Sequence, residues 1–242
     1  PMELDGSLAF YWFDAHEDMN APGSIYLFGK VADGAGGFAS CCVQLKGCER
    51  NAFVLPREMT EDGAEVNFVD VFKEVSSICR KNKISKFGCK KVERQYAFEE
   101  RGVPANAAYL KLVYSGEYPA LPADLSGETF SHVFGTHTSC LELLLLKRRI
   151  GGPCWLTLTG VAPATSSASW AKYEVALPTG KKGISIRKDA PAPPPLVVAA
   201  LHVQTILSSK HVPEIALASV ITHQSVLVDG ATPNPTALTA FS

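Results

Sequence analysis

The order of hydrophobic patterns between residues 51 and 160 limits the fold of this chain more than any other feature. A short apolar strand is expected at residues 53–55, and beyond it apolar residues recur every three or four positions. That spacing is typical of one face of a helix, which we expect over residues 67–81 with Asn67 as its cap. Strands are predicted next at residues 84–98 and 108–114.

A second helix is predicted by the clearest start signal in the sequence. Ser139 and Glu142 form a capping-box pattern directly before the leucine run at residues 143–146. Three cations follow at residues 147–149, where they complement the negative end of the helix dipole, and a Gly-Gly-Pro sequence ends the helix. A further strand is then expected at residues 155–159.

Together these elements give the order β-α-β-β-α-β over residues 51–160. This is the topology of the ferredoxin-like unit, which RNA-recognition modules (RRMs) share. Residues 1–50 add several short strands around a glycine-rich turn at residues 33–37. The sequence therefore predicts an α+β chain whose N-terminal domain is rich in strands and contains a ferredoxin/RRM-like unit.

A change of composition at residues 180–195 predicts a domain boundary. The proline-rich run at residues 189–195 favours an extended connector without helix. Two long apolar stretches follow and are interpreted as buried strands, at residues 196–203 and 214–227. The chain stops soon after them, so we expect a truncated second domain with unpaired strand edges. The expected domains are residues 1–190 and residues 191–242.

Charge and cysteine usage exclude several classes of protein. The formal net charge of −1 provides no global attraction to nucleic acid or to a membrane, so any DNA contact must come from a local patch. Seven cysteines without a CxxC pair favour reduced thiols in a nuclear or cytosolic protein over a disulfide framework or a zinc site. The most apolar run, residues 141–146, is too short to span a bilayer.

Two polar groupings contain residue types that can bind metal ions. Residues 14–18 hold three carboxylates and an imidazole, but they lack EF-hand spacing, and a solvated loop is the favoured interpretation. His132 and His137 are five residues apart, which matches no usual pair of metal ligands. No nucleophile with a neighbouring base can be identified, so no catalytic residue is predicted.

One basic segment is a candidate nucleic-acid contact. Residues 80–94 contain seven cations and a single acidic residue, with two aromatic residues close by, so phosphate contacts can combine with base stacking. The alternative, which we favour on sequence alone, is an edge strand whose lysines oppose aggregation. The candidate contacts are Lys86, Lys90, Lys91 and Arg94.

Several motifs, taken together and in order, resemble the alpha-type catalytic subunits of family B DNA polymerases. The resemblance covers essentially the whole chain in one register. Its strongest part is the stretch from Leu-Ser-Gly-Glu-Thr-Phe-Ser-His at residues 125–132 to Gly-Pro-Cys-Trp-Leu at residues 152–156. The other motifs are Phe-Tyr-Trp-Phe-Asp-Ala at 10–15, Tyr-Leu-Phe-Gly-Lys at 26–30, Leu-Pro-Arg-Glu at 55–58, Tyr-Ala-Phe-Glu at 96–99 and Pro-Pro-Pro-Leu-Val-Val at 193–198.

The resemblance implies part of a nuclear replication enzyme. Such an enzyme works with primase and an accessory subunit, and it extends RNA primers along a DNA template with Mg²⁺ in its polymerase site. The N-terminal domain, with its RRM-like unit, is expected to flank the template strand. The palm motifs Asp-x-x-Ser-Leu-Tyr-Pro-Ser and Asp-Thr-Asp do not occur in this sequence, so we expect no polymerase site and no cofactor in this segment.

The resemblance also implies that the second domain begins an RNase H-like 3′–5′ exonuclease fold. Proofreading relatives carry Asp-x-Glu on its first strand, and the register puts His202 and Gln204 at those positions. Neutral imidazole and amide groups cannot supply the negative oxygens that paired magnesium ions require. A degenerate exonuclease-like domain without proofreading activity is therefore expected.

Three functions stay open at this point. The leading hypothesis is a non-catalytic scaffold that binds the DNA template or an RNA–DNA primer. The second is a stand-alone module that binds single-stranded RNA or DNA, and the third is a purely structural domain that touches no nucleic acid. Membrane association is not expected.

Overall fold

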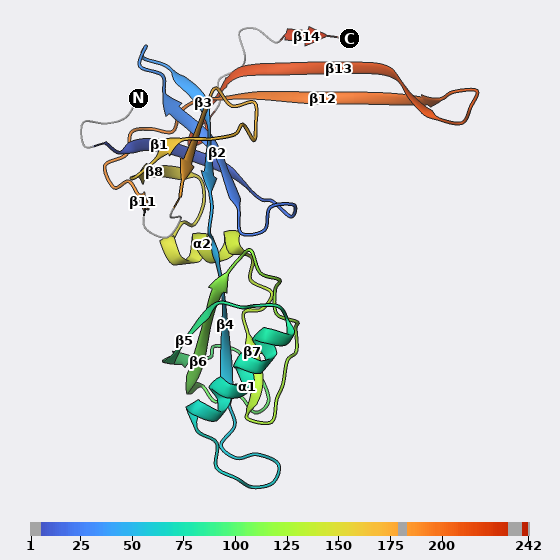
Figure 1. The fold of residues 1–242 in the computed structure, drawn as a ribbon. Helices are drawn as coiled ribbons and strands as arrows, with labels where there is room; N and C mark the ends of the chain where they lie inside the picture. Colours follow the sequence, from blue (N-terminus) through green and yellow to red (C-terminus); the bar gives the residue numbers. More distant parts are fainter. Residues whose placement is uncertain (1–5, 179–182, 232–238, 242) are drawn as a thin grey trace. The chain divides into compact units, whose positions relative to one another are not determined.

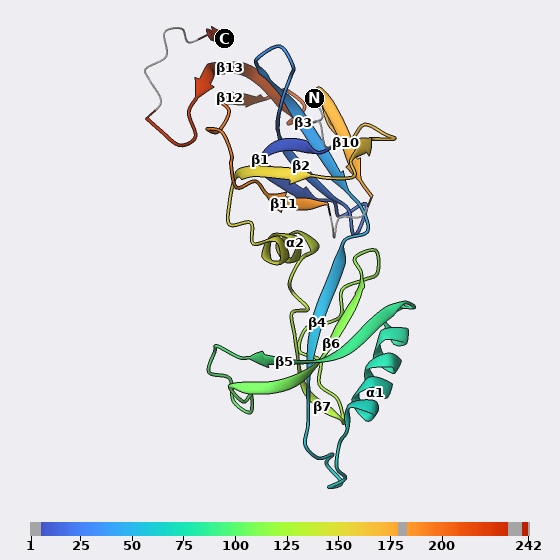
Figure 2. The same cartoon turned by 90° about the vertical axis from the view of Figure 1, so that its left-hand side faces the viewer.

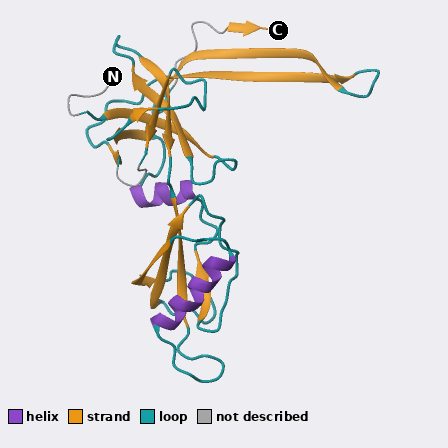
Figure 3. Cartoon of the chain, viewed as in Figure 1, coloured by secondary structure: helices purple, strands orange, loops and turns teal. Residues whose placement is uncertain are grey.

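The computed structural model describes residues 6–178, 183–231 and 239–241. The chain divides into two compact units, Pro1–Ile186 and Arg187–Ser242, each of which is described by itself. Strands dominate both units, and the described residues form two helices, α1 (Phe68–Lys81) and α2 (Cys140–Arg148) (Figures 1 and 3). Among the described residues, neither helix is long and apolar enough to cross a membrane.

The first unit contains a seven-stranded sheet with the order β11-β8-β1-β2-β3-β10-β9. The neighbouring strands run antiparallel except for β10 and β3, which pair in parallel. The strands expected within the first fifty residues are present in this sheet, and β2 shows the alternating burial of a strand with one covered face. Its strands are β1 (Leu8–Glu17), β2 (Ile25–Ala32), β3 (Phe38–Leu45), β8 (Cys154–Leu158), β9 (Ala162–Pro163), β10 (Tyr173–Leu177) and β11 (Ile184–Ile186).

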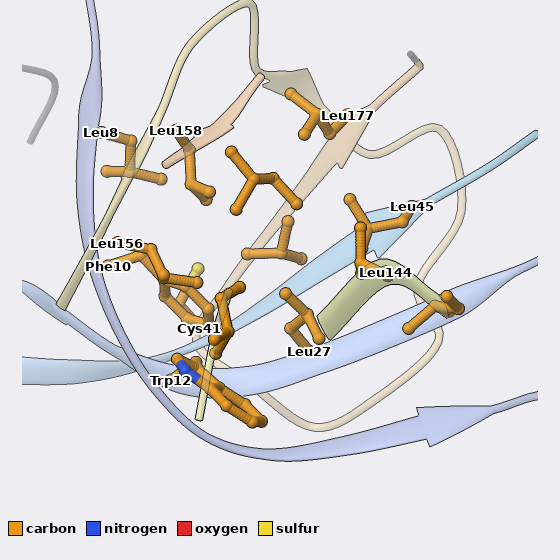
Figure 4. Packing of buried hydrophobic residues seen from close by; sticks show 14 of the residues in the cluster. Leu8, Phe10, Trp12, Leu27, Cys41, Leu45, Leu144, Leu156, Leu158 and Leu177 are labelled. Carbon is orange, nitrogen blue, oxygen red and sulfur yellow. The ribbon is translucent and has the colours of Figure 1, made fainter. Parts of the chain in front are cut away.

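The core of this sheet is made of large apolar side chains from many strands. Phe10, Leu45 and Leu156 are fully buried in it, although they are far apart in the sequence. Figure 4 shows Leu144 of α2 turned toward the same cluster as Leu27 of β2. Helix α2 is therefore held by the apolar face that it contributes to this core, as is usual for a short helix.

A four-stranded antiparallel sheet forms the other part of the first unit, with the order β5-β6-β4-β7. Helix α1 covers one face of it and buries Val71 and Cys79 against Leu112 and Phe130 (Figure 2). The helix begins where the sequence predicts, because Asn67 accepts hydrogen bonds from the first free N–H groups. The strands are β4 (Glu49–Pro56), β5 (Phe87–Gln95), β6 (Asn106–Ser115) and β7 (Phe130–Phe134).

The predicted β-α-β-β-α-β unit is wrong in its last strand. β8 pairs with β1 in the seven-stranded sheet, and the fourth strand of the smaller sheet is β7, which precedes α2. A strand's partner depends on contacts across the fold, which a local apolar pattern does not encode. The remaining order is that of a split β-α-β arrangement, because β6 lies between the two strands that α1 connects.

The second unit contains a long antiparallel hairpin of β12 (Leu196–Leu207) and β13 (Pro213–Val226), with β14 (Thr239–Phe241) beside β13. Both long strands were expected, but their predicted burial is not found within the described residues. Leu201 and Ile215 are 67% and 70% exposed. An apolar stretch predicts a strand that is stable when buried. It does not predict whether another element covers that strand.

Candidate nucleic-acid interface

The four cations proposed from the sequence lie on different surfaces of the smaller sheet. Lys90 and Arg94 are an odd number of positions away from Phe87 and Cys89, which pack with α1 in the core of this sheet, so both cations lie on the opposite face. Lys91 lies on the α1 side, where its Nζ is 4.8 Å from the centre of the Phe68 ring. Lys86 precedes β5 and lies outside the strand.

The face of the four-stranded sheet opposite α1 is called the open face below. One row of residues crosses it through direct strand pairing, because Lys90 lies opposite Lys111, Lys111 opposite Phe53, and Phe53 opposite Phe134. Directly paired residues place their side chains on the same face of a sheet. Two cations and two aromatic rings therefore lie side by side across all four strands.

Phe134 is the centre of an aromatic group on the open face. Its ring centre is 5.1 Å from that of Tyr96 and 6.2 Å from that of Tyr109, in tilted and edge-to-face arrangements. The ring of His132 stacks on Phe134 at 5.7 Å with an angle of 7° between the planes. These separations are those of attractive aromatic pairs, so the rings hold one another in place.

Cations surround the neighbouring ring of Phe53. Lys111 Nζ is 5.6 Å from the ring centre and Arg94 Cζ is 5.8 Å from it, both within the range of a cation–π contact. Burial lowers the pKa of Lys111, and the positive charges of Lys147, Arg94 and Lys90 lower it further. Glu49 acts in the opposite direction and raises the pKa, so Lys111 lies among several cations and one nearby carboxylate.

A cavity of about 200 Å³ opens between these side chains. Its lining combines four aromatic residues with a cation and an amide. The lining residues are Phe53, Arg94, Gln95, Tyr96, Tyr109 and Phe134.

Sequence reasoning missed most of this site. The sequence places Phe53 on a short apolar strand at residues 53–55, and it does not predict the strand that carries His132 and Phe134. Three of the five residues in Phe-Ser-His-Val-Phe, residues 130–134, are aromatic or β-branched, and this composition is the signal that indicates a strand. Its place beside Phe53 follows only from the strand pairing.

His202 and Gln204 lie in the second unit, on β12, opposite Ser219 and Leu217 of β13. Both side chains are exposed. An imidazole and an amide do not fit a pair of magnesium ions, which need negatively charged oxygen ligands. Within the residues that the structure describes, no group of three or more His, Cys, Asp or Glu side chains could hold a metal ion.

The curated relatives of this chain described below carry the same name. No family model matches the chain. The chain is 44% identical over 98% of its length to the "DNA polymerase alpha catalytic subunit" of Xenopus laevis. The corresponding proteins of Mus musculus and Arabidopsis thaliana are 44% and 34% identical over 96% and 97% of the chain. The chain spans only 16–17% of the length of these relatives.

The fold has a solved counterpart. The structure of the family B DNA polymerase from the hyperthermophilic archaeon Pyrobaculum calidifontis matches 97% of the chain with a TM-score of 0.53 and 13% identity. The match covers 26% of that polymerase and concerns the fold alone. From the sequence relatives, the chain belongs to the family of DNA polymerase alpha catalytic subunits.

Proposed function

We propose that this segment binds single-stranded nucleic acid on the open face, as a non-catalytic, template-side part of a replicative DNA polymerase. The row of Lys90, Lys111, Phe53 and Phe134 is the observation that supports the proposal most directly. Proteins that bind single strands combine cations along the phosphate backbone with aromatic rings on which bases stack. Both elements occur together on this face.

A single strand fits this surface better than a duplex does. The bases of a duplex are already stacked on one another, so aromatic side chains such as Phe134 and His132 can stack only on bases that are free. The overall charge of −1 gives no general attraction to DNA, so binding would depend on the few cations of the open face.

We propose that the whole protein is a DNA polymerase alpha catalytic subunit, which the names of its relatives support. It is a nuclear enzyme that extends RNA primers on a DNA template, with Mg²⁺ in a polymerase site outside this segment. Primase and the accessory subunit are its proposed protein partners. Within this segment, residues 1–190 form the proposed N-terminal domain, and residues 191–242 begin an RNase H-like domain in which His202 and Gln204 replace the exonuclease carboxylates.

The split β-α-β order, with aromatic residues on the face away from the helix, also supports a second candidate function. RNA-recognition modules bind single-stranded RNA on the corresponding surface. The ferredoxin/RRM-like assignment of the smaller sheet is therefore kept as part of the proposal, and RNA is tested beside DNA.

Adjacent lysines on opposite faces of β5 provide the test. We expect Lys90→Ala to weaken binding of a single-stranded oligodeoxynucleotide several-fold, because Lys90 lies on the open face. The loss of the Lys90 ammonium group should reduce the slope of log affinity against log salt concentration by about 0.7, the value for one phosphate contact on a single strand. Fluorescence anisotropy over a salt series measures both quantities.

Lys91→Ala is the matched control, because Lys91 lies over Phe68 on the side of α1. Equal effects of the two substitutions would contradict the proposed face. A wild-type chain that binds neither single-stranded DNA nor RNA at low salt would leave only the structural role. Tighter binding of RNA than of DNA of the same sequence would favour the second candidate.

A further inference from the structure

We infer that the cavity of the open face seats one unstacked nucleobase of the bound strand. The inference rests on the proposed function and narrows it to a base-binding pocket. It assigns the pocket to the six lining residues given above, with Phe53, Tyr96 and Phe134 as the rings available to a base.

The cavity has room for a group much larger than a single water molecule. A single water molecule needs about 10–15 Å³ of such space, whereas this cavity offers about 200 Å³. Tyr109, which is 3% exposed, forms its buried part, while Tyr96 and Phe134 remain partly exposed. A flat, ring-sized group can therefore enter from solvent and meet aromatic surface inside.

The positive charge beside the cavity indicates that the ring-shaped ligand is the base of a nucleotide. Arg94 both lines the cavity and is exposed to solvent, and Lys111 lies within 5.6 Å of the Phe53 ring centre. A base that enters brings a phosphate with it, and these two cations are in position to bind that phosphate. An uncharged apolar ligand would leave them without a partner anion.

Binding should depend more on stacking of the base than on hydrogen bonds to its edge. Four of the six lining residues are aromatic, and every nucleobase has a face on which an aromatic ring can stack. We therefore expect only a modest preference among the bases. Phe98, which is 77% exposed and 5.9 Å from Tyr96 between ring centres, extends the aromatic surface for the next base.

The test compares two probes of equal length on the full chain, an oligodeoxythymidylate and an abasic oligomer with the same phosphates. We expect the wild-type chain to bind the oligodeoxythymidylate about 5- to 150-fold more tightly, which is the effect of stacking one base. Tyr96→Ala should remove most of that difference and leave the salt slope unchanged, because Tyr96 carries no charge. Fluorescence anisotropy gives the affinities.

Tyr173→Ala is the matched control, because Tyr173 is a tyrosine beside a cation, Lys172, but belongs to β10 of the larger sheet. It should preserve the difference between the probes. If circular dichroism shows that Tyr96→Ala unfolds, Tyr96→Leu keeps the apolar volume without the ring, and the same loss is expected.

The failures of the two proposals are distinguishable. Equal, salt-sensitive binding of both probes by the wild-type chain would overturn the base pocket and leave phosphate binding intact. A difference that survives the Tyr96 substitutions would place the stacked base elsewhere and also overturn the pocket. Binding of neither probe would overturn the proposed function itself.

Discussion

At the scale of single residues, Glu174 of β10 organises the loop that precedes its strand. Its carboxylate accepts hydrogen bonds from the N–H groups of Ala168 and Ser169, each at 2.8 Å, and from the Ser167 and Ser169 hydroxyls. The Gln44 amide donates another at 2.8 Å. Burial acts to raise the pKa of Glu174, but these hydrogen bonds outweigh it and lower the pKa to about 2.

This depressed pKa predicts how acid affects stability. A carboxylate whose pKa is lowered by folding stabilises the native state above its ordinary pKa of 4.5, and that contribution is lost as the pH falls toward about 2. We expect Glu174→Gln to lower the free energy of unfolding by about 1 kcal/mol at neutral pH. Denaturation at several pH values measures the free energy of unfolding of both proteins. The difference between the variant and the wild type should disappear as the pH falls from 4.5 to about 2. A difference independent of pH would contradict the assigned role of the carboxylate.

At the scale of elements, helix α2 is capped by three side chains, two of them local and one from a distant strand. Ser139 Oγ accepts from the Glu142 N–H at 3.1 Å, and Glu142 accepts in return from the Ser139 N–H at 2.8 Å. Glu17 of β1 accepts a third hydrogen bond, at 2.9 Å, from the N–H of Leu141. The same carboxylate forms an ion pair with Arg50 at 3.7 Å. The carboxylate at residue 17 is therefore part of the fold, and the expected solvated loop is wrong at this position.

Removing the local cap should destabilise the chain measurably. We expect Ser139→Ala to lower the free energy of unfolding by about 1 kcal/mol, the usual cost of losing an N-cap side chain. Urea denaturation followed by circular dichroism measures the change. Ser126→Ala, at an exposed loop serine, is the control and should have little effect. Equal destabilisation by both substitutions would argue against the cap.

The same elements explain what a sequence can and cannot predict here. Both helices were predicted because Asn67 and Ser139 lie next to the N–H groups that they satisfy, so the signal is local. The partner of β8 was not predicted because strand pairing is decided by residues far away in the sequence. β7 was not predicted because five residues without a polar–apolar alternation give only a weak local signal for a strand. The cluster around Phe134 was missed for the first of these reasons, since its members come from separate strands.

At the scale of the whole molecule, the two units differ in how far their apolar side chains are buried. The first unit buries them in two clusters, one for each sheet. The hairpin of β12 and β13 leaves many exposed, Leu201 and Ile215 among them. Long strands with exposed apolar side chains tend to associate with other molecules.

We therefore expect the isolated chain to self-associate through this hairpin. Leu201→Lys combined with Ile215→Lys should shift the sedimentation profile toward the monomer at concentrations at which the wild type associates. Met19→Lys, at an 85% exposed loop position in the first unit, is the control and should not change it. Unchanged association in the double variant would exclude the hairpin as the cause.

The row that crosses the smaller sheet also sets a length and a direction for any strand bound there. Neighbouring strands are about 4.8 Å apart, so the three steps from Lys90 to Phe134 span about 14 Å. That distance is the length of the footprint that the row offers to a bound single strand. Because the cations lie at one end of the row and the rings at the other, the footprint is polar, and the two orientations of a strand are not equivalent on it.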